Sequence, residues 1–216
     1  YSSGTTGAPK GCMHTHRSAM ATIIHRVVWT NSTSESVILA TLPYFHVTGM
    51  QGAMSGPIYN GGTAVIMTRW DRKVAAQLIE RHRVTGWVNI ATMAIDFLSD
   101  PDLERYDLSS LVSVGGGGAA MPKAVEEKLH RLTGLRYIEG YGLSETIAAT
   151  HINPVPRPKA QCLGIPVFDV DSRVIDLNTG QELGPDEVGE IVSRGPQLFQ
   201  GYWNRPEETE RAFIEL

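Results

Sequence analysis

The sequence lacks any apolar run close to the ~18 residues that a membrane-spanning helix needs. It has only two cysteines, Cys12 and Cys162, whose wide separation matches no metal-binding or redox motif and favours a reducing compartment. Basic residues are scattered through a chain of net charge −4, which gives no support for nucleic-acid binding. These absences favour a globular cytoplasmic protein without a transmembrane segment, with peripheral membrane association left open.

What the sequence does contain is a loop rich in glycine and hydroxyl groups at residues 1–11, Tyr-Ser-Ser-Gly-Thr-Thr-Gly-Ala-Pro-Lys-Gly. Glycines let a backbone approach a ligand closely, successive N–H groups can bind an anion, and a lysine adds positive charge. The loop therefore favours a polyphosphate site, although its composition would also suit a flexible polar loop. It does not match the Walker A pattern, because Pro9 precedes Lys10 and Gly11 replaces the Ser/Thr that binds magnesium.

This loop resembles the signature loop of the adenylate-forming superfamily, which includes the acyl-CoA synthetases, the luciferases and the adenylation domains of peptide synthetases. The family pattern is two hydroxyl residues followed by Gly-Thr-Thr-Gly-x-Pro-Lys-Gly, and residues 2–11 match every specified position. The resemblance implies that the loop binds the phosphates of ATP and that Lys10 holds the departing pyrophosphate. The residues concerned are Ser2, Ser3, Gly4, Thr5, Thr6, Gly7 and Lys10.

Strand-like and helix-like segments alternate after the loop, which predicts βα units and a largely parallel sheet. The expected strands are 37–40, 63–67, 87–91, 111–114 and 135–139, and the expected helices begin at 15 or 16 and span 71–83, 93–98 and 122–133. Apolar periodicity predicts which side chains face inward. In the first helix they are Met20, Ile23, Ile24, Val27 and Val28, and in the helix capped by Asp71 they are Val74, Leu78 and Ile79.

Past about residue 153 the pattern changes to short strands, expected at 167–170, 173–177 and 190–193, after a stiff linker with three prolines. We therefore predict an α/β fold with a mixed, largely parallel sheet flanked by helices at residues 1–155. A small antiparallel β subdomain is expected to follow at 156–216. The chain starts inside a motif, so we expect an internal piece of a longer protein, and the resemblance implies a mobile C-terminal domain beyond it.

The segment Tyr-Gly-Leu-Ser-Glu-Thr at residues 141–146 is a second candidate site. A carboxylate after a glycine turn at a strand end can bind Mg²⁺, but a capping Ser144 with an exposed Glu145 is the more ordinary interpretation of these residues alone. The family has Tyr-Gly-x-Thr-Glu here, which implies that Glu145 binds magnesium, that Ser144 contacts the phosphates and that Tyr141 lies against the adenine. The nucleotide contacts implied around them are Glu139, Gly140 and Gly142.

Four consecutive glycines, 115–118, follow an expected strand and precede a helix. They would let a flat ligand lie directly on the backbone, or they are a tight turn that needs close packing. The family has Ser-Gly-Gly-Ala-Pro at this point, lining the adenine and the acyl carboxylate. The resemblance assigns that role to Gly116, Gly117, Gly118 and Ala119.

His46 lies in the segment Pro-Tyr-Phe-His-Val-Thr-Gly at residues 43–49. A lone histidine beside aromatic residues is more often structural than functional. The acyl-CoA synthetase branch, however, has Phe-His-x-x-Gly at this distance from the phosphate loop, lining the carboxylate pocket. The amino-acid-activating branch has an aspartate instead, so His46 argues against a substrate with a buried ammonium group.

The resemblance implies an acid–thiol ligase that uses ATP and Mg²⁺ to convert a carboxylic acid, fatty or aryl, into an acyl-adenylate and then into a thioester with coenzyme A. Lys10, Ser144, Glu145 and His46 are the candidate catalytic residues. The alternatives are a nucleotide-binding module without turnover, a luciferase-like enzyme and an amino-acid-adenylating domain. A homodimer is left open, and the 216-residue piece alone is expected to be inactive. Matching segments at 163–166, 189–196 and 201–209 are interpreted as mainly structural, and histidines other than His46 are given no role.

Overall fold

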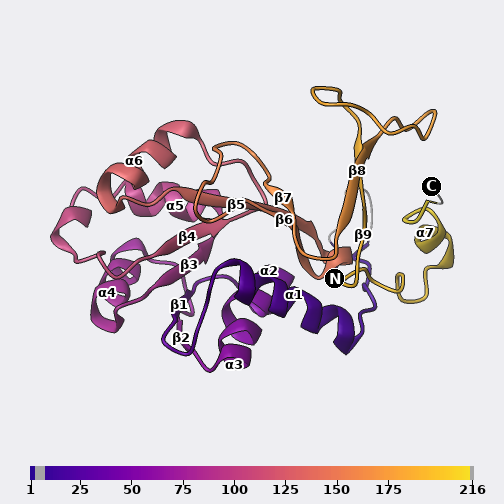
Figure 1. Cartoon of the computed structure of the whole chain (residues 1–216). Helices are drawn as coiled ribbons and strands as arrows, with labels where there is room; N and C mark the ends of the chain where they lie inside the picture. The colour runs from indigo at the N-terminus through magenta and orange to yellow at the C-terminus, as the bar shows by residue number, and fades with distance from the viewer. Residues whose placement is uncertain (3–7, 215–216) are drawn as a thin grey trace.

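The computed structural model describes residues 1–2 and 8–214, and its centre is a seven-stranded sheet of order β2-β1-β3-β4-β5-β6-β7 (Figure 1). The first five strands in this order run parallel, whereas β6 pairs antiparallel with β5 and β7. The mixed, largely parallel sheet predicted from the sequence is therefore confirmed. The strands are β1 Val37–Ala40, β2 Thr63–Ile66, β3 Gly86–Asn89, β4 Ser113–Gly116, β5 Tyr137–Leu143, β6 Ala148–Ile152 and β7 Ile165–Pro166.

Helices cover both faces of this sheet (Figure 1). One layer contains α4 (Arg72–His82), α5 (Ala91–Leu98) and α6 (Lys123–Thr133). The other contains α1 (His16–Trp29), α2 (Val47–Gly49), the π-helix η1 (Met50–Ser55) and α3 (Gly56–Asn60). Short 3₁₀ turns occur at Leu103–Arg105 and Ser144–Thr146.

The side chains of β1 show how the sheet separates two cores. Leu39 is fully buried in the larger core, beneath α4, α5 and α6. Its neighbours Ile38 and Ala40 point to the opposite face and pack with Ala53 of η1 and Tyr44. This alternation follows from the two-residue period of a strand.

Trp87 of β3 is the largest fully buried side chain and organises the larger core. Its ring stacks on Trp70 at a centroid distance of 5.6 Å and meets Phe97 of α5 edge-on at 5.0 Å. Its indole N–H donates to Thr41 Oγ1 at 3.0 Å, which satisfies the one polar atom of the ring.

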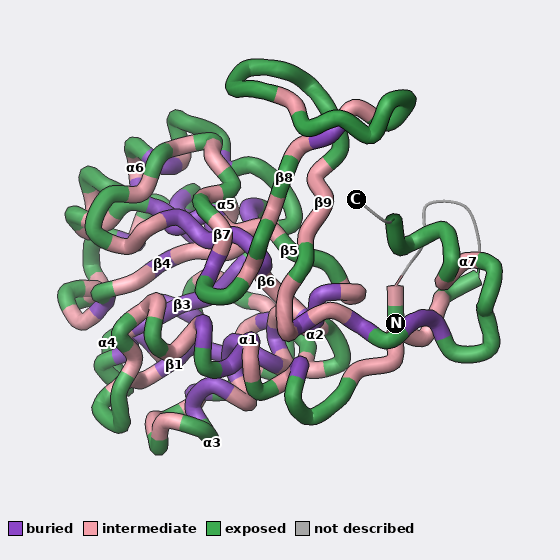
Figure 2. The backbone as a smooth tube through the Cα atoms, turned by 45° about the vertical axis from the view of Figure 1, so that its right-hand side comes forward, coloured by how far each residue is buried: buried purple, intermediate pink, exposed green. Residues whose placement is uncertain are grey.

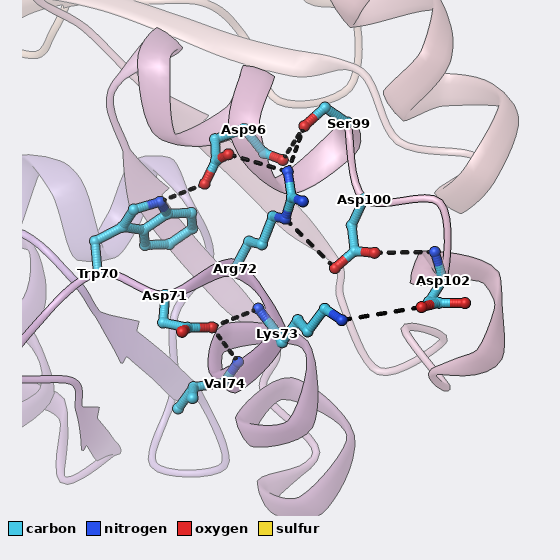
Figure 3. Close-up of polar contacts among 9 residues, drawn as sticks. All are labelled: Trp70, Asp71, Arg72, Lys73, Val74, Asp96, Ser99, Asp100 and Asp102. Carbon is cyan, nitrogen blue, oxygen red and sulfur yellow. Dashed lines mark hydrogen bonds and ion pairs between the residues drawn. The ribbon is translucent and has the colours of Figure 1, made fainter.

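Charged residues connect α4 to α5 at the surface of this core (Figure 3). Asp71 caps α4 by accepting from the N–H groups of residues 73 and 74 at 2.9 and 3.0 Å. Arg72 pairs with Asp96 of α5 at 3.3 Å and with the buried Asp100 at 3.6 Å. The predicted cap of this helix is confirmed, and the ion pairs join the start of α4 to α5 and to the segment after it.

Several predicted boundaries are wrong. The fourth strand begins at Ser113 and extends into the glycines, and β5 continues through the Gly-Tyr-Gly segment that was expected to be a turn. Strand β6 (Ala148–Ile152) was not predicted, and residues 167–170 form no strand. Bonds across the sheet decide these boundaries, because glycines weaken local strand preference but still pair where neighbouring strands supply partners.

The inward stripe predicted for α1 is mostly wrong. Met20 and Ile24 are each 39% exposed and Val28 is 57% exposed, whereas the buried residues are Ser18, Thr22, Ile23 and His25. The packed face therefore lies about one residue around the helix from the apolar stripe. In α4, Ile79 is buried and Leu78 is partly buried as predicted, but Val74 is exposed and Ala75 and Ala76 are buried.

After β7 the chain forms a small antiparallel sheet of β8 (Asp171–Ile175) and β9 (Glu190–Arg194), followed by α7 (Pro206–Glu210). This confirms a small antiparallel unit after the large sheet. Its loops project away from the large sheet and are mostly exposed (Figure 2). The subdomain boundary at residue 155 stays a prediction. Among the described residues no helix is long and apolar enough to cross a membrane.

We expect Ile79→Ala to lower the free energy of unfolding by about 2–5 kcal/mol, because it leaves a cavity beneath β1. Val74→Ala, on the exposed side of the same helix, should change it by no more than about 0.5 kcal/mol. Urea unfolding of both variants measures the difference. Similar losses in the two variants would contradict the observed facing of α4.

Candidate functional site

A cavity of about 560 Å³ lies where α1 and η1 face the carboxyl ends of the parallel strands. Carboxyl ends of parallel strands are where open α/β sheets bind ligands. The cavity has apolar walls with polar groups at intervals. From the sequence-predicted site its lining includes Ser2, His46, Gly116, Gly117, Gly118, Gly140, Tyr141, Gly142, Ser144 and Glu145.

The phosphate-loop residues are only partly described. Ser2 and Lys10 pair through two backbone hydrogen bonds of 2.8 and 3.1 Å, which bring the two ends of the loop together. Ser2 lines the cavity. The predicted contacts of Ser3, Gly4, Thr5, Thr6 and Gly7 lie outside the described residues.

Tyr202 lies between the two charged residues that the sequence analysis singled out. The Lys10 ammonium lies 4.1 Å from the centroid of the Tyr202 ring, and the Tyr202 hydroxyl donates to Glu145 Oε1 at 2.6 Å. Burial, followed by this bond to Glu145, raises the pKa of the Tyr202 hydroxyl, so the phenol stays protonated. Residues 201–204 were interpreted as mainly structural, and the structure gives Tyr202 direct contact with Lys10 and Glu145.

Backbone pairing of residues 11–13 with 200–203 holds Tyr202 in this position. Met13 N donates to Gly201 O at 2.9 Å, and Trp203 N donates to Gly11 O at 2.8 Å. The backbones of Cys12 and Tyr202 form an antiparallel β-bridge in the same short ladder. Burial and the Glu145 carboxylate raise the pKa of the Cys12 thiol to about 11, which keeps it protonated at neutral pH.

The turn that contains Ser144 and Glu145 is held by groups outside it. Phe199 N donates to Glu145 O at 2.8 Å, and His14 Nε2 donates to Ser144 O at 2.7 Å. The carbonyl can only accept, so this bond fixes the His14 tautomer with its proton on Nε2. Burial lowers the pKa of His14, which favours the neutral ring. Sequence reasoning gave His14 no role, and only its position just ahead of α1 could have drawn attention to it.

Glu145 is suited to a magnesium ion in the presence of phosphates. Its Oε1 accepts from Tyr202, and among the described residues its Oε2 has no hydrogen-bond partner. Mg²⁺ is commonly held by one or two carboxylates together with substrate phosphates. The part of the chain that the structure describes contains no group of three or more His, Cys, Asp or Glu that could hold a metal by itself. The donor set therefore fits a cation that arrives with a polyphosphate.

Packing requires the glycines of β4, and the same glycines line the cavity. A Cβ on Gly116 would lie 1.9 Å from Asn89 O and 2.7 Å from the Tyr137 hydroxyl. That hydroxyl donates to Asn89 Oδ1 at 3.0 Å, so the three residues form one tightly packed unit at the strand ends. Gly118 has a φ of +85° and open space around its Cα, where backbone conformation instead favours glycine.

Glu139 and Ala119 are not among the residues that line the cavity. The Glu139 carboxylate is buried and accepts from Met121 N at 2.9 Å, which ties β5 to the start of α6. Burial raises the pKa of Glu139, with the nearby Glu126 as a further cause. Ala119 is exposed at the turn. The geometry gives Glu139 a structural contact, so its predicted role in nucleotide binding rests on the resemblance alone.

Tyr141 and His46 lie on different walls of the cavity. Tyr141 lies in β5 with its ring 5.9 Å from that of His151, and burial raises the pKa of its hydroxyl. His46 caps α2, where its Nδ1 accepts from Thr48 N at 3.2 Å, so its Nε2 remains available to a ligand. The structure thus brings the adenine candidate and the carboxylate-pocket candidate to one cavity.

The amino-acid sequence of the chain is similar to those of known enzymes. The family model described as AMP-binding enzyme matches residues 1–203. A long-chain-fatty-acid–CoA ligase from Bacillus subtilis (strain 168) is 37% identical over 212 residues, which cover 97% of this chain and 38% of the relative. 4-Coumarate–CoA ligase 4 from Arabidopsis thaliana is 34% identical over 221 residues, covering 98% of this chain and 39% of the relative.

The fold is likewise similar to that of a solved structure. The crystal structure of ATP-bound MatB from Rhodopseudomonas palustris superposes with a TM-score of 0.93 at 27% sequence identity. The match covers 100% of this chain and 42% of that one. The chain therefore spans about two fifths of the length of the relatives it matches.

We expect Tyr202→Phe to lower the free energy of unfolding by about 1–3 kcal/mol, because it removes a buried hydrogen bond to a carboxylate. Tyr59→Phe is the matched control, since Tyr59 is 50% exposed and should change stability by no more than about 0.5 kcal/mol. Urea unfolding measures both. An unchanged midpoint for Tyr202→Phe would show that the hydroxyl does not hold Glu145.

His151 should make stability depend on pH. Burial lowers its folded-state pKa below the ordinary 6.5, so its contribution is present above 6.5 and is lost as the pH falls through the lower folded-state value. Replacing it with glutamine should therefore flatten the decline in urea midpoint between about pH 7 and about pH 5. His82→Gln, on the exposed end of α4, is the control and should leave the slope unchanged. Equal slopes in wild type and His151→Gln would refute this.

Proposed function

The chain belongs to the AMP-binding enzyme family, and on that basis we propose that the whole protein is an ATP-dependent acid–CoA ligase. In the first half-reaction a carboxylate oxygen attacks the α-phosphorus of ATP, and the bond to pyrophosphate breaks. In the second, the thiol of coenzyme A loses its proton to solvent, its sulfur attacks the acyl carbon, and AMP leaves with the electrons of the broken C–O bond. The acyl group ends as a thioester.

One observation carries this proposal: Lys10 and Glu145 both contact Tyr202, beside a cavity with apolar walls. Phosphoryl transfer needs positioning and charge neutralisation more than covalent help from the protein. Lys10 would hold the departing pyrophosphate, and the free oxygen of Glu145 would bind Mg²⁺. The bound cation supplies further positive charge to the phosphates. Ser144, on the same turn, would donate its hydroxyl to a phosphate oxygen.

The acyl group is assigned to the space between α1, η1 and the strand ends. Leu42, Val88, Ile90 and Ile138 give this part of the cavity its apolar character, which supports a fatty or aryl acid. His46 borders the same space and would contact the reacting carboxylate through Nε2. An α-amino acid is disfavoured, because an ammonium group beside His46 would lack a counter-charge. A cytoplasmic location, a homodimer and inactivity of the 216-residue chain alone remain predictions.

The proposal is tested on the full-length protein by carboxylate-dependent exchange of pyrophosphate into ATP and by thioester formation with coenzyme A. Glu145→Gln should lower kcat on the order of 10²-fold, since the phosphates lose a metal ligand. Removing Mg²⁺ with a chelator should abolish exchange. Glu207→Gln, at the exposed start of α7, is the control and should leave kcat unchanged. Nucleotide binding without exchange, for every acid tried, would instead support a binding module.

A further inference from the structure

Arg26 is the only lysine or arginine among the described residues that line the cavity. It lies on α1, in the run Ile-Ile-His-Arg-Val-Val, where a charged residue interrupts an apolar segment. The start of α1 is anchored near the Ser144 turn, because His14 contacts both Ser144 O and Ser18 Oγ. Arg26 comes eight residues after Ser18, which is about 12 Å farther along the helix axis. Its backbone is therefore displaced along α1 away from the phosphate side of the cavity.

The Arg26 guanidinium has no acceptor among the described residues, whether side chain or backbone, although its neighbours in the cavity wall are satisfied. Gln51 Nε2 donates to Thr22 Oγ1 at 2.9 Å and to Ala19 O at 3.2 Å. Thr30 Oγ1 donates to Arg26 O at 2.9 Å. Five N–H donors on one side chain are thus left for whatever occupies the cavity.

This arrangement is unfavourable for stability. The side chain is partly buried, and desolvation lowers its pKa to about 10. A charge removed from water without a partner destabilises a fold, and such groups are usually paired or replaced. An unpaired guanidinium at a cavity wall therefore points to a functional role, because it lowers stability.

Gly52 of η1 provides the space for this guanidinium. A Cβ on Gly52 would lie 3.3 Å from Arg26 Cζ, closer than most real Cβ contacts, so any larger residue would press on the side chain. The absence of a side chain at position 52 lets Arg26 extend along the cavity wall. The backbone of η1 thus shapes the pocket around the cation.

We propose that the acid which this protein activates carries a second carboxylate, and that Arg26 binds it. The inference rests on the proposed function and names its substrate class: an α,ω-dicarboxylic acid with an apolar spacer. A planar guanidinium matches a carboxylate through two parallel hydrogen bonds. The apolar wall between the ends suits the spacer. Because the backbone of Arg26 lies about 12 Å along α1 from Ser18, which is near the phosphate side, we assign Arg26 to the carboxylate at the other end of the substrate.

The test compares matched pairs of monocarboxylic and α,ω-dicarboxylic acids with equal numbers of carbon atoms, on the full-length protein. Wild type should show a kcat/KM about 10–100-fold higher for the diacid at the best chain length. Arg26→Met should remove or reverse that preference while retaining activity with the monoacid. Arg26→Lys should retain part of it, because the charge remains and the two-point geometry is lost. Arg17→Met, an exposed arginine on the same helix, should change nothing.

Two further measurements separate the possible outcomes. Diacid binding without ATP, followed by calorimetry, should weaken in Arg26→Met and stay unchanged in Arg17→Met, which tests the inference even if no acid is turned over. The Tm of Arg26→Met should equal or exceed that of wild type, because an unpaired charge is removed. A fall of several degrees, with equal loss for both acids, would mean that Arg26 has a structural partner and would overturn the inference. An unchanged preference would overturn it as well and leave the ligase function standing.

Discussion

The hydrogen bond between Tyr202 and Glu145 is the contact on which the arrangement of the site depends. It joins a residue near the end of the chain to the turn after β5, and the same phenol ring lies against Lys10. The pairing of residues 11–13 with 200–203, together with the hydrogen bond from Phe199 N to Glu145 O, brings these three side chains together. The positive and negative groups needed for polyphosphate chemistry therefore meet because the two ends of the chain are paired.

The parallel sheet supplies the rest of the geometry. The strands β1, β3, β4 and β5 end beside one cavity, so residues as distant in the sequence as Leu42 and Glu145 meet around it. Close approach of β3, β4 and β5 leaves no room for a Cβ at Gly116. The tight-packing interpretation of the glycine run therefore holds at Gly116, whereas contact with a ligand stays a prediction for glycines that line the cavity.

Two kinds of polar group occur in and around the site: those whose hydrogen bonds are made inside the protein, and those that face the cavity with donors or acceptors left over. Gln51 in the cavity wall, and Trp87 and Tyr137 in the larger core, are buried with their hydrogen bonds made inside the protein. Glu145 and Arg26 face the cavity with donors or acceptors unused by the described residues. The first group makes the pocket rigid, and the second is where a ligand would recover the free energy of desolvation.

The sequence by itself determined the family, the α/β class and ten of the residues around the cavity, because these depend on local motifs and on the alternation of strands and helices. It gave the wrong inward face for α1, missed β6 and treated the Gly-Tyr-Gly segment as a turn. It also assigned no function to Tyr202, His14 or Arg26. Only the tertiary structure decided these points, because each depends on a partner far away in the sequence: η1 covers one side of α1, β6 pairs with β5, and residues 11–13 position Tyr202. Local periodicity describes what a segment could bury, whereas long-range packing selects what it does bury.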